Sequence, residues 1–184
     1  MKRYIRSDIN LSRNQRLEAA KYSSDPKVLV QLANHWDKGV RSYVAENPNT
    51  PTEILAQLAN DRDWGVRHRV AENLNTPTEV LTQLANDVDK AVRISVVHNP
   101  NTPADVLTKL ANDVTVRWSV PDNPNTPTEV LVQLANDRDR YIRWNVAENP
   151  NTPANVLAQL ANDEDEAVRN AAAKNLNIFN LTRG

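Results

Sequence analysis

One segment of about 26 residues repeats along most of this chain of 184 residues, and the repetition limits what the chain can fold into. The copy that begins at Asn47 reads NPNTPTEILAQLANDRDWGVRHRVAE, and a degenerate copy precedes it from Ser23. Sequence periods of roughly 20 to 50 residues are typical of solenoids, in which each copy stacks on the next. The other copies, which also open with N-x-N-T-P, begin at Asn73, Asn99, Asn123 and Asn149.

The first half of each copy is predicted to form a short α-helix. Thr50 is a preferred N-cap residue, Pro51 suits the first helical position, and Glu53 is placed to complete a capping box with Thr50. The apolar residues between Ile54 and Ala59 then fall on one face at helical spacing. We therefore expect a first helix that starts at the Thr-Pro pair and buries this face.

The second half of each copy predicts another short helix. Asp61 and Asp63 interrupt the first helix and are available to cap the second, whose apolar face contains Val66, Val70 and Ala71. We expect the N-P-N of the next copy to end this helix, because proline cannot continue a helix. Helices of two or three turns are marginal in isolation, so the repeats must stack to build a core.

The repeat motif resembles a known family. The pattern L-A-N-D-x-D-x-x-V-R-x-x-V-A-x-N-P-N-T-P, which recurs between about Ser23 and Asn177, is similar to that of the leucine-rich repeat variant family. The resemblance implies a right-handed superhelix in which an α-helix is paired with a short α- or 3-10 helix, without β-sheet. It also implies a scaffold for binding and supplies no catalytic residues.

These observations predict an all-α, right-handed solenoid of two-helix repeats and one continuous domain. We expect an N-terminal half-repeat cap at 1–22, six tandem repeats at 23–174 and a C-terminal cap or tail at 175–184. The Asn99 copy lacks two residues before Val116 and has Pro121 in its second helix. We expect this second helix to be the shortest, with a local change of superhelical twist centred on residues 113–122.

Composition and motifs argue against several functional classes. Lys and Arg total 22 against 23 Asp and Glu, and there is no cysteine. We expect neither a signal peptide nor a membrane-spanning segment. The three histidines, His35, His68 and His98, lack metal-ligand spacing. The paired carboxylates recur in every standard copy, whereas an active site would break the repeat once. We therefore predict a cytoplasmic protein that is not an enzyme and needs no metal or cofactor.

The exposed positions of the second helix differ from copy to copy, which marks them as candidate partner-binding positions. The position of His68 reads Ser, His, Ile, Trp, Trp and Asn along the six copies, and an acidic row lies one turn further on. Exposed aromatic side chains make hot spots in interfaces, although the tryptophans could instead pack between neighbouring second helices. The candidate residues are His68, Glu72, Ile94, Trp118, Asp122, Tyr141, Trp144 and Glu148.

An arginine follows the inward Val or Ile of every second helix. A functional interpretation makes this column a ladder for phosphates. The structural interpretation, which we favour, is that each arginine bonds nearby aspartates and turn carbonyls, because the aspartates recur in step with the arginines. The column consists of Arg41, Arg67, Arg93, Arg117, Arg143 and Arg169.

The sequence favours a scaffold that binds an unidentified protein or peptide, with the acidic row favouring a basic segment. A nucleic-acid-binding or DNA-repair HEAT-like protein is an alternative, with basic patches in two repeats, and a purely architectural repeat module is another. The balanced charge counts against nucleic acid as a partner, and nothing in the sequence suggests a membrane. The arginines of those patches are Arg62, Arg67, Arg69, Arg138, Arg140 and Arg143.

Overall fold

A computed structural model describes the backbone of residues 11–183 and the side chains of residues 11–176. Residues 1–10 of the expected N-terminal cap and Gly184 of the expected tail lie outside this range. Within the described residues every regular element is a helix and there is no strand, which confirms the all-α prediction.

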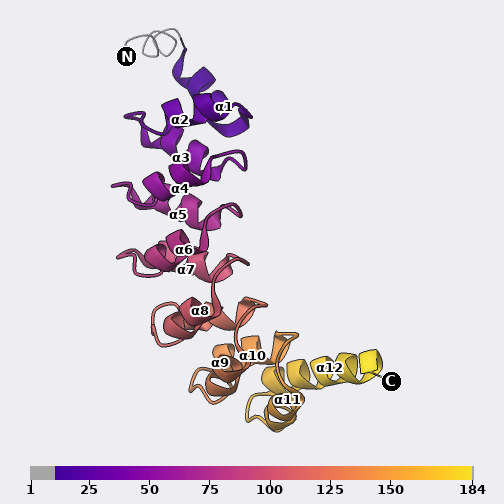
Figure 1. Ribbon diagram of the computed structural model, residues 1–184. Helices are drawn as coiled ribbons and strands as arrows, with labels where there is room; N and C mark the ends of the chain where they lie inside the picture. Colours follow the sequence, from indigo (N-terminus) through magenta and orange to yellow (C-terminus); the bar gives the residue numbers. More distant parts are fainter. Residues whose placement is uncertain (1–10, 184) are drawn as a thin grey trace. The chain divides into compact units, whose positions relative to one another are not determined.

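The helices alternate between the first and second halves of the repeats (Figure 1). Helices α2, α4, α6, α8, α9 and α11 are first helices, and α3, α5, α7, η2, α10 and α12 are second helices. Their bounds are α1 Arg13–Tyr22, α2 Pro26–Leu32, α3 Lys38–Glu46, α4 Thr52–Leu58, α5 Trp64–Glu72, α6 Thr78–Leu84, α7 Lys90–His98, α8 Ala104–Leu110, η2 Arg117–Asp122, α9 Thr128–Leu134, α10 Arg140–Glu148, α11 Ala154–Leu160 and α12 Glu166–Arg183.

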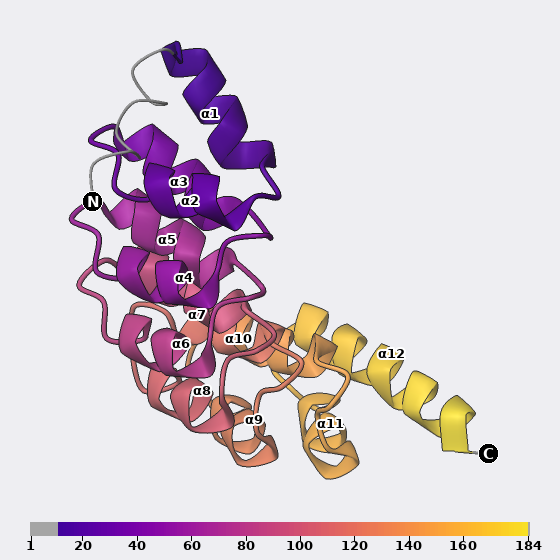
Figure 2. The same ribbon diagram turned by 45° about the horizontal axis from the view of Figure 1, so that its top comes forward.

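The described residues fall into two compact units, unit 1 up to Leu84 and unit 2 from Ala85 onward. In unit 1, α3 packs against both α1 and α5 (Figure 2). In unit 2, η2 packs between α7 and α10, and α10 packs in turn against α12. Consecutive second helices therefore contact each other within each unit, as stacked repeats require.

The core of each repeat is built from two leucines of the first helix and the apolar face of the second. Leu55 and Leu58 are buried on α4, and Val66, Val70 and Ala71 are buried on α5. The same leucine pair recurs in all six repeats, and its members are the largest fully buried side chains among the described residues. The predicted inward faces of both helices are confirmed.

The caps differ between the two kinds of helix. Asp63 caps α5 by accepting a hydrogen bond from the N–H of Gly65, as predicted. The expected capping box at Thr50 and Glu53 is wrong: the Thr50 hydroxyl donates instead to the carbonyl of Val44, six residues earlier, at 2.5 Å. Thr50 therefore adds a second hydrogen bond to a carbonyl in the last turn of the preceding helix, which also accepts from the N–H of Asn47 at 3.1 Å.

The end of a second helix does not require the proline of N-P-N, so that part of the expectation is also wrong. Helix α5 ends at Glu72 although Leu74 stands where other copies have proline. Helix α12 instead continues from Glu166 to Arg183, past Asn175. The sequence around Leu74 keeps the Thr-Pro pair, whereas the last copy has Ile-Phe in its place, so Thr-Pro accompanies the helix end.

The short copy has the shortest second helix, as predicted. Its η2 is a 3-10 helix of six residues, whereas α3, α5, α7 and α10 are α-helices of nine residues. Pro121 has no N–H to offer the carbonyl of Trp118, and the Asn145 side chain of the next repeat donates to that carbonyl at 2.9 Å. The altered twist at residues 113–122 stays a prediction.

A buried asparagine joins successive turns. The Nδ2 group of Asn149 donates to the carbonyls of Pro121 and Asn123, at 2.6 and 3.2 Å, and its Oδ1 accepts from the N–H of Asn151 at 2.8 Å. One side chain thus holds its own turn and bonds the preceding repeat twice. The side chains that make the same two inter-repeat bonds are those of Asn47, Asn73, Asn123, Asn149 and Asn175.

We predict that Asn149→Ala lowers the free energy of unfolding by about 2 to 4 kcal/mol, because it removes two buried hydrogen bonds to the preceding repeat and one within its own turn. The matched control is Asn162→Ala, which removes one exposed hydrogen bond to the carbonyl of Ala158 and should cost about 0.5 kcal/mol or less. Urea unfolding followed by circular dichroism measures both variants. Equal losses in the two would contradict the role given to Asn149.

Candidate functional site

The constant exposed residues of the first helices form bonds between repeats. The Nε2 group of Gln57 donates to Oδ1 of Asn34 at 3.1 Å, and Gln159 donates to Asn136 at 3.0 Å. Lys109, the one exception to the glutamine, donates to Asn86 in the same way. The near-constancy of this position therefore has a structural cause.

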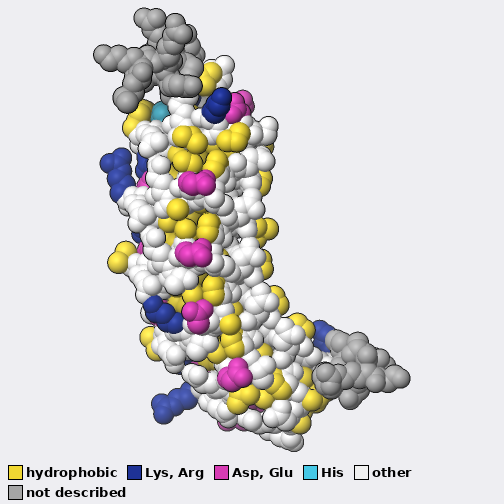
Figure 3. All heavy atoms as spheres, viewed as in Figure 1, with side chains coloured by type: hydrophobic (Ala, Val, Ile, Leu, Met, Phe, Trp, Pro, Cys, Tyr) yellow, Lys and Arg dark blue, Asp and Glu magenta, His cyan; other side chains and the backbone are white. Residues whose placement is uncertain are grey.

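The face shown in Figure 3 carries hydrophobic side chains in small patches, with acidic side chains between them. Its apolar surface is divided, whereas partner interfaces tend to present larger continuous apolar patches. This face is therefore a weaker candidate for binding than a surface on which aromatic side chains gather.

The arginine column makes clamps between consecutive inter-helix turns. In unit 1, Arg41 donates to both carboxylate oxygens of Asp61, at 2.5 and 2.9 Å, and to the carbonyls of His35 and Trp36. In unit 2, Arg143 bonds Asp163 in the same two-pronged way at 2.7 and 2.9 Å. Each clamp therefore joins the second helix of one repeat to the inter-helix turn of the next.

The other members of the column make related contacts. Arg93 pairs with Asp113 at 2.8 Å and Arg117 pairs with Asp137 at 3.2 Å. Arg67 and Arg169 donate to turn carbonyls of their own repeats, at 2.8 and 2.7 Å. These contacts direct every arginine of the column to an inter-helix turn, which supports the structural interpretation.

Hydrogen bonds at the inter-helix turns also hold aspartates in their charged form. The hydrogen bond from Arg143 holds the pKa of Asp163 below its ordinary value, and the bond from Lys38 does the same for the pKa of Asp63. The hydrogen bond from the backbone N–H of Gly39 likewise lowers the pKa of Asp37.

The candidate residues of unit 1 lie on α5 and form a charged network. His68 is half-buried, with Nε2 at 3.3 Å from Glu72, and its ring and the Trp64 ring are in a T-shaped arrangement with centroids 6.1 Å apart. Arg69 pairs with Glu72 at 2.8 Å and approaches Glu46 at 3.9 Å. Much of the negative charge in this part of the acidic row is therefore balanced locally.

The aromatic candidates of unit 2 are exposed rather than packed away. Trp118 on η2 and Trp144 on α10 are 43% and 40% exposed, and Tyr141 is 63% exposed. Ile94 on α7 is half-buried. The tryptophans are thus partly covered by the neighbouring structure while each keeps a large free surface.

Tyr141 and Trp144 line a hollow of about 300 Å³ together with Arg140, Asp165 and Ala167. Arg140 lies over the Tyr141 ring, 5.0 Å from its centroid, and pairs with Asp165 at 3.0 Å. Ala167 occupies the position in its repeat that Tyr141 occupies in the preceding one. The smaller side chain leaves room beside the aromatic pair.

The acidic candidates of unit 2 remain accessible. The side chains of Asp122 and Glu148 are each 40% exposed. The nearest basic side chains, His98 beside Asp122 and Lys174 beside Glu148, each lie 3.9 Å away, at the outer limit of an ion pair, and His98 carries a charge only when protonated. Such exposed pairs contribute little, so both carboxylates are open to a competing cation.

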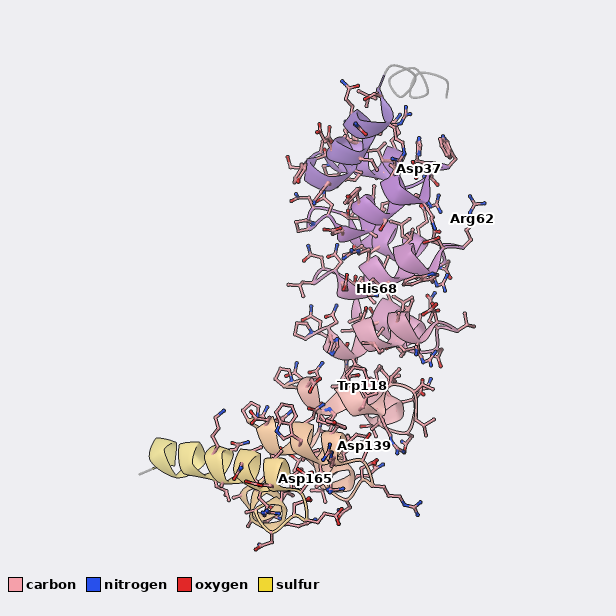
Figure 4. The ribbon with its side chains drawn as sticks, turned by 180° about the vertical axis from the view of Figure 1, so that it is seen from behind. Asp37, Arg62, His68, Trp118, Asp139 and Asp165 are labelled. Carbon is pink, nitrogen blue, oxygen red and sulfur yellow. The ribbon has the colours of Figure 1, made fainter. Side chains whose placement is uncertain are left out.

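Sequence reasoning missed several exposed residues because it considered the helices and passed over the turns. Trp36 is highly exposed, as are Val88 and Val114. Arg62, at the same repeat position, projects away from the ribbon (Figure 4). This position, between the paired turn residues, varies from copy to copy, and comparing the copies there would have identified it.

Within residues 11–176 no group of three potential metal-ligating side chains occurs. None of the described helices is long and apolar enough to cross a membrane. The features left to consider for function are therefore the arginine clamps between repeats and the exposed side chains that vary between copies.

The repeats of this chain match a known repeat family. The family model described as leucine rich repeat variant matches residues 39–63, 64–89 and 91–115. A solved structure titled "A leucine-rich repeat variant with a novel repetitive protein structural motif" is 32% identical, covers 90% of this chain and 67% of its own, and superposes with a TM-score of 0.68. The chain belongs to the leucine-rich repeat variant family.

Other comparisons support the fold of this leucine-rich repeat variant without adding a function. An engineered protein of 19% identity, covering 92% of this chain and 63% of its own, superposes with a TM-score of 0.51 and shows the fold alone. No functionally curated protein matches the chain. Family membership identifies the chain as a helical-repeat scaffold and a solenoid, as expected.

The clamp at Asp163 predicts a pH dependence of stability. Because the folded-state pKa of Asp163 lies below its unfolded value of about 3.9, its contribution is present above that pH and is lost as the pH falls through the folded pKa. We expect Asp163→Asn to lower the free energy of unfolding by about 2 kcal/mol at pH 7 and by less at pH 3. Urea unfolding at several pH values measures this, and a pH-independent difference would contradict it.

Proposed function

We propose that this leucine-rich repeat variant is a non-enzymatic scaffold that binds a protein or peptide through the second-helix face of unit 2. The observation that carries the proposal is the hollow beside Tyr141 and Trp144, whose aromatic walls keep a large exposed surface. Exposed tryptophan and tyrosine beside a pocket are typical of interface hot spots, because they bury much apolar area when a partner binds.

The contrast between constant, bonded residues and variable, exposed residues supports this proposal. The asparagines, glutamines and arginines common to the copies are engaged in bonds within and between repeats. The exposed second-helix side chains differ between copies, so their identity is not dictated by stacking. A variable surface on a constant frame is what a repeat scaffold needs for selective binding.

Charge favours a basic segment as the partner. Asp122 and Glu148 lie on the same second helices as the tryptophans, and the nearest basic side chains are exposed and 3.9 Å away. Lysine or arginine side chains of a partner would compete for these carboxylates, while an apolar side chain enters the hollow. His68, Glu72 and Ile94 remain candidate contacts, with Glu72 less available because Arg69 holds it.

The alternatives receive less support. Arg143 and Arg67 are bonded to carboxylates or carbonyls, and Arg69 and Arg140 are engaged by Glu72 and Asp165, which leaves few free cations for nucleic acid. A purely architectural role requires no exposed aromatic side chains beside a hollow.

We predict that Tyr141→Ala/Trp144→Ala reduces partner recovery at least tenfold, as loss of hot-spot side chains does. The full chain serves as bait for quantitative mass spectrometry of proteins captured from lysate of its source cells. Raising the salt concentration should also reduce recovery, because the partner segment is expected to be basic.

The matched control is Tyr22→Ala, which removes an exposed tyrosine of unit 1. Circular dichroism verifies that all variants are folded. Partners that the double variant captures as well as the wild type would rule out this face as the binding site.

A further inference from the structure

A second surface lies in unit 1, at the turns that connect first to second helices. Two hollows of about 460 and 410 Å³ open there, and they share Trp36, Arg41 and Arg62 as lining residues. Neither hollow shares a lining residue with the Tyr141 and Trp144 hollow, which belongs to unit 2.

The charges around these hollows cancel in pairs, with one exception. Arg13 pairs with Asp37 at 2.8 Å, and Lys38 pairs with Asp63 at 2.9 Å. The remaining pair, Arg41 with Asp61, is at 2.5 Å.

Arg62 is the exception. It is exposed and projects away from the ribbon (Figure 4). Within the described part of the chain its side chain makes no hydrogen bond or ion pair. One positive charge is therefore left available at this surface.

Trp36 supplies the apolar part of the surface. Its side chain is 74% exposed, and its ring lies against the His35 ring at 5.3 Å between centroids. The backbone at Trp36 is held by Arg41, which donates to its carbonyl at 3.0 Å. The ring thus stands on a fixed turn, so little backbone ordering is needed when it binds.

We propose that Trp36 and Arg62 form a binding site for an acidic protein segment in which one carboxylate side chain neighbours an apolar side chain. A guanidinium binds a carboxylate through two parallel hydrogen bonds, and an indole face covers an apolar side chain. Because the surface has one available cation, it matches one carboxylate rather than a run of them.

The balance of charged side chains around the hollows also disfavours nucleic acid as the ligand of this surface. A nucleic acid brings a negative charge with every nucleotide, and the carboxylates of Asp37, Asp61 and Asp63 lie around the single available cation. The combination is also specific to this place. Arg138 occupies the same repeat position in unit 2, but the preceding repeat presents Val114 where a tryptophan would be needed.

Selection from a phage library of random 12-residue peptides tests the proposal, with the full wild-type chain as target and counter-selection on Trp36→Ala/Arg62→Ala. We expect enriched peptides to contain Asp or Glu beside an apolar residue. A synthetic peptide of the enriched sequence should bind Trp36→Ala and Arg62→Ala at least tenfold more weakly than the wild type, by isothermal titration calorimetry. Changing its acidic residue to the amide should weaken binding at least fivefold.

Arg138→Ala is the matched control, because it makes the same change at the same repeat position without a tryptophan neighbour, and it should bind the peptide as the wild type does. Tyr141→Ala/Trp144→Ala should also bind normally, which separates this site from the proposed function. The inference is overturned if no peptide distinguishes wild type from the counter-selection variant, if enriched peptides lack acidic residues, or if a 20-residue oligothymidylate competes for the site.

Discussion

The hydrogen-bonding needs of a turn buried between repeats govern the rest of this structure. Helices of seven and nine residues leave many main-chain groups at their ends without helical partners, and buried groups of this kind must be satisfied. The asparagine that opens each turn meets this need with one amide, which accepts from its own turn and donates twice to the preceding repeat.

Much of the fold could be predicted because periodicity reports directly on burial. The positions of Leu55, Leu58, Val66 and Val70 were sufficient to place two inward faces, and Asp63 identified one helix start. The Thr50 capping box failed because a threonine hydroxyl beside two helices has two possible acceptors. The choice between them depends on how the chain turns, which local sequence does not encode.

The candidate site could be predicted from the sequence less well than the fold. Periodicity indicates which side of a helix faces outward, but the free surface of Trp144 depends on the side chain presented by the next repeat. A small Ala167 opens the hollow where a second tyrosine would fill it. Trp36 was missed because a turn has no periodicity from which exposure can be inferred, although the variation among copies at its position was visible.

The two kinds of bond between repeats differ in what they demand of a neighbour. An arginine clamp needs an aspartate at a particular place in the next repeat, so each clamp constrains two side chains at once. The asparagine amide bonds main-chain carbonyls, which every residue provides, including Pro121. A duplicated repeat therefore carries its own asparagine donor. The main-chain carbonyls of any preceding repeat can accept from that donor. Because these hydrogen bonds to the main chain do not depend on the side chains of the neighbour, one repeat can replace another. An array of this kind can therefore lengthen or shorten by whole copies while its exposed side chains diverge.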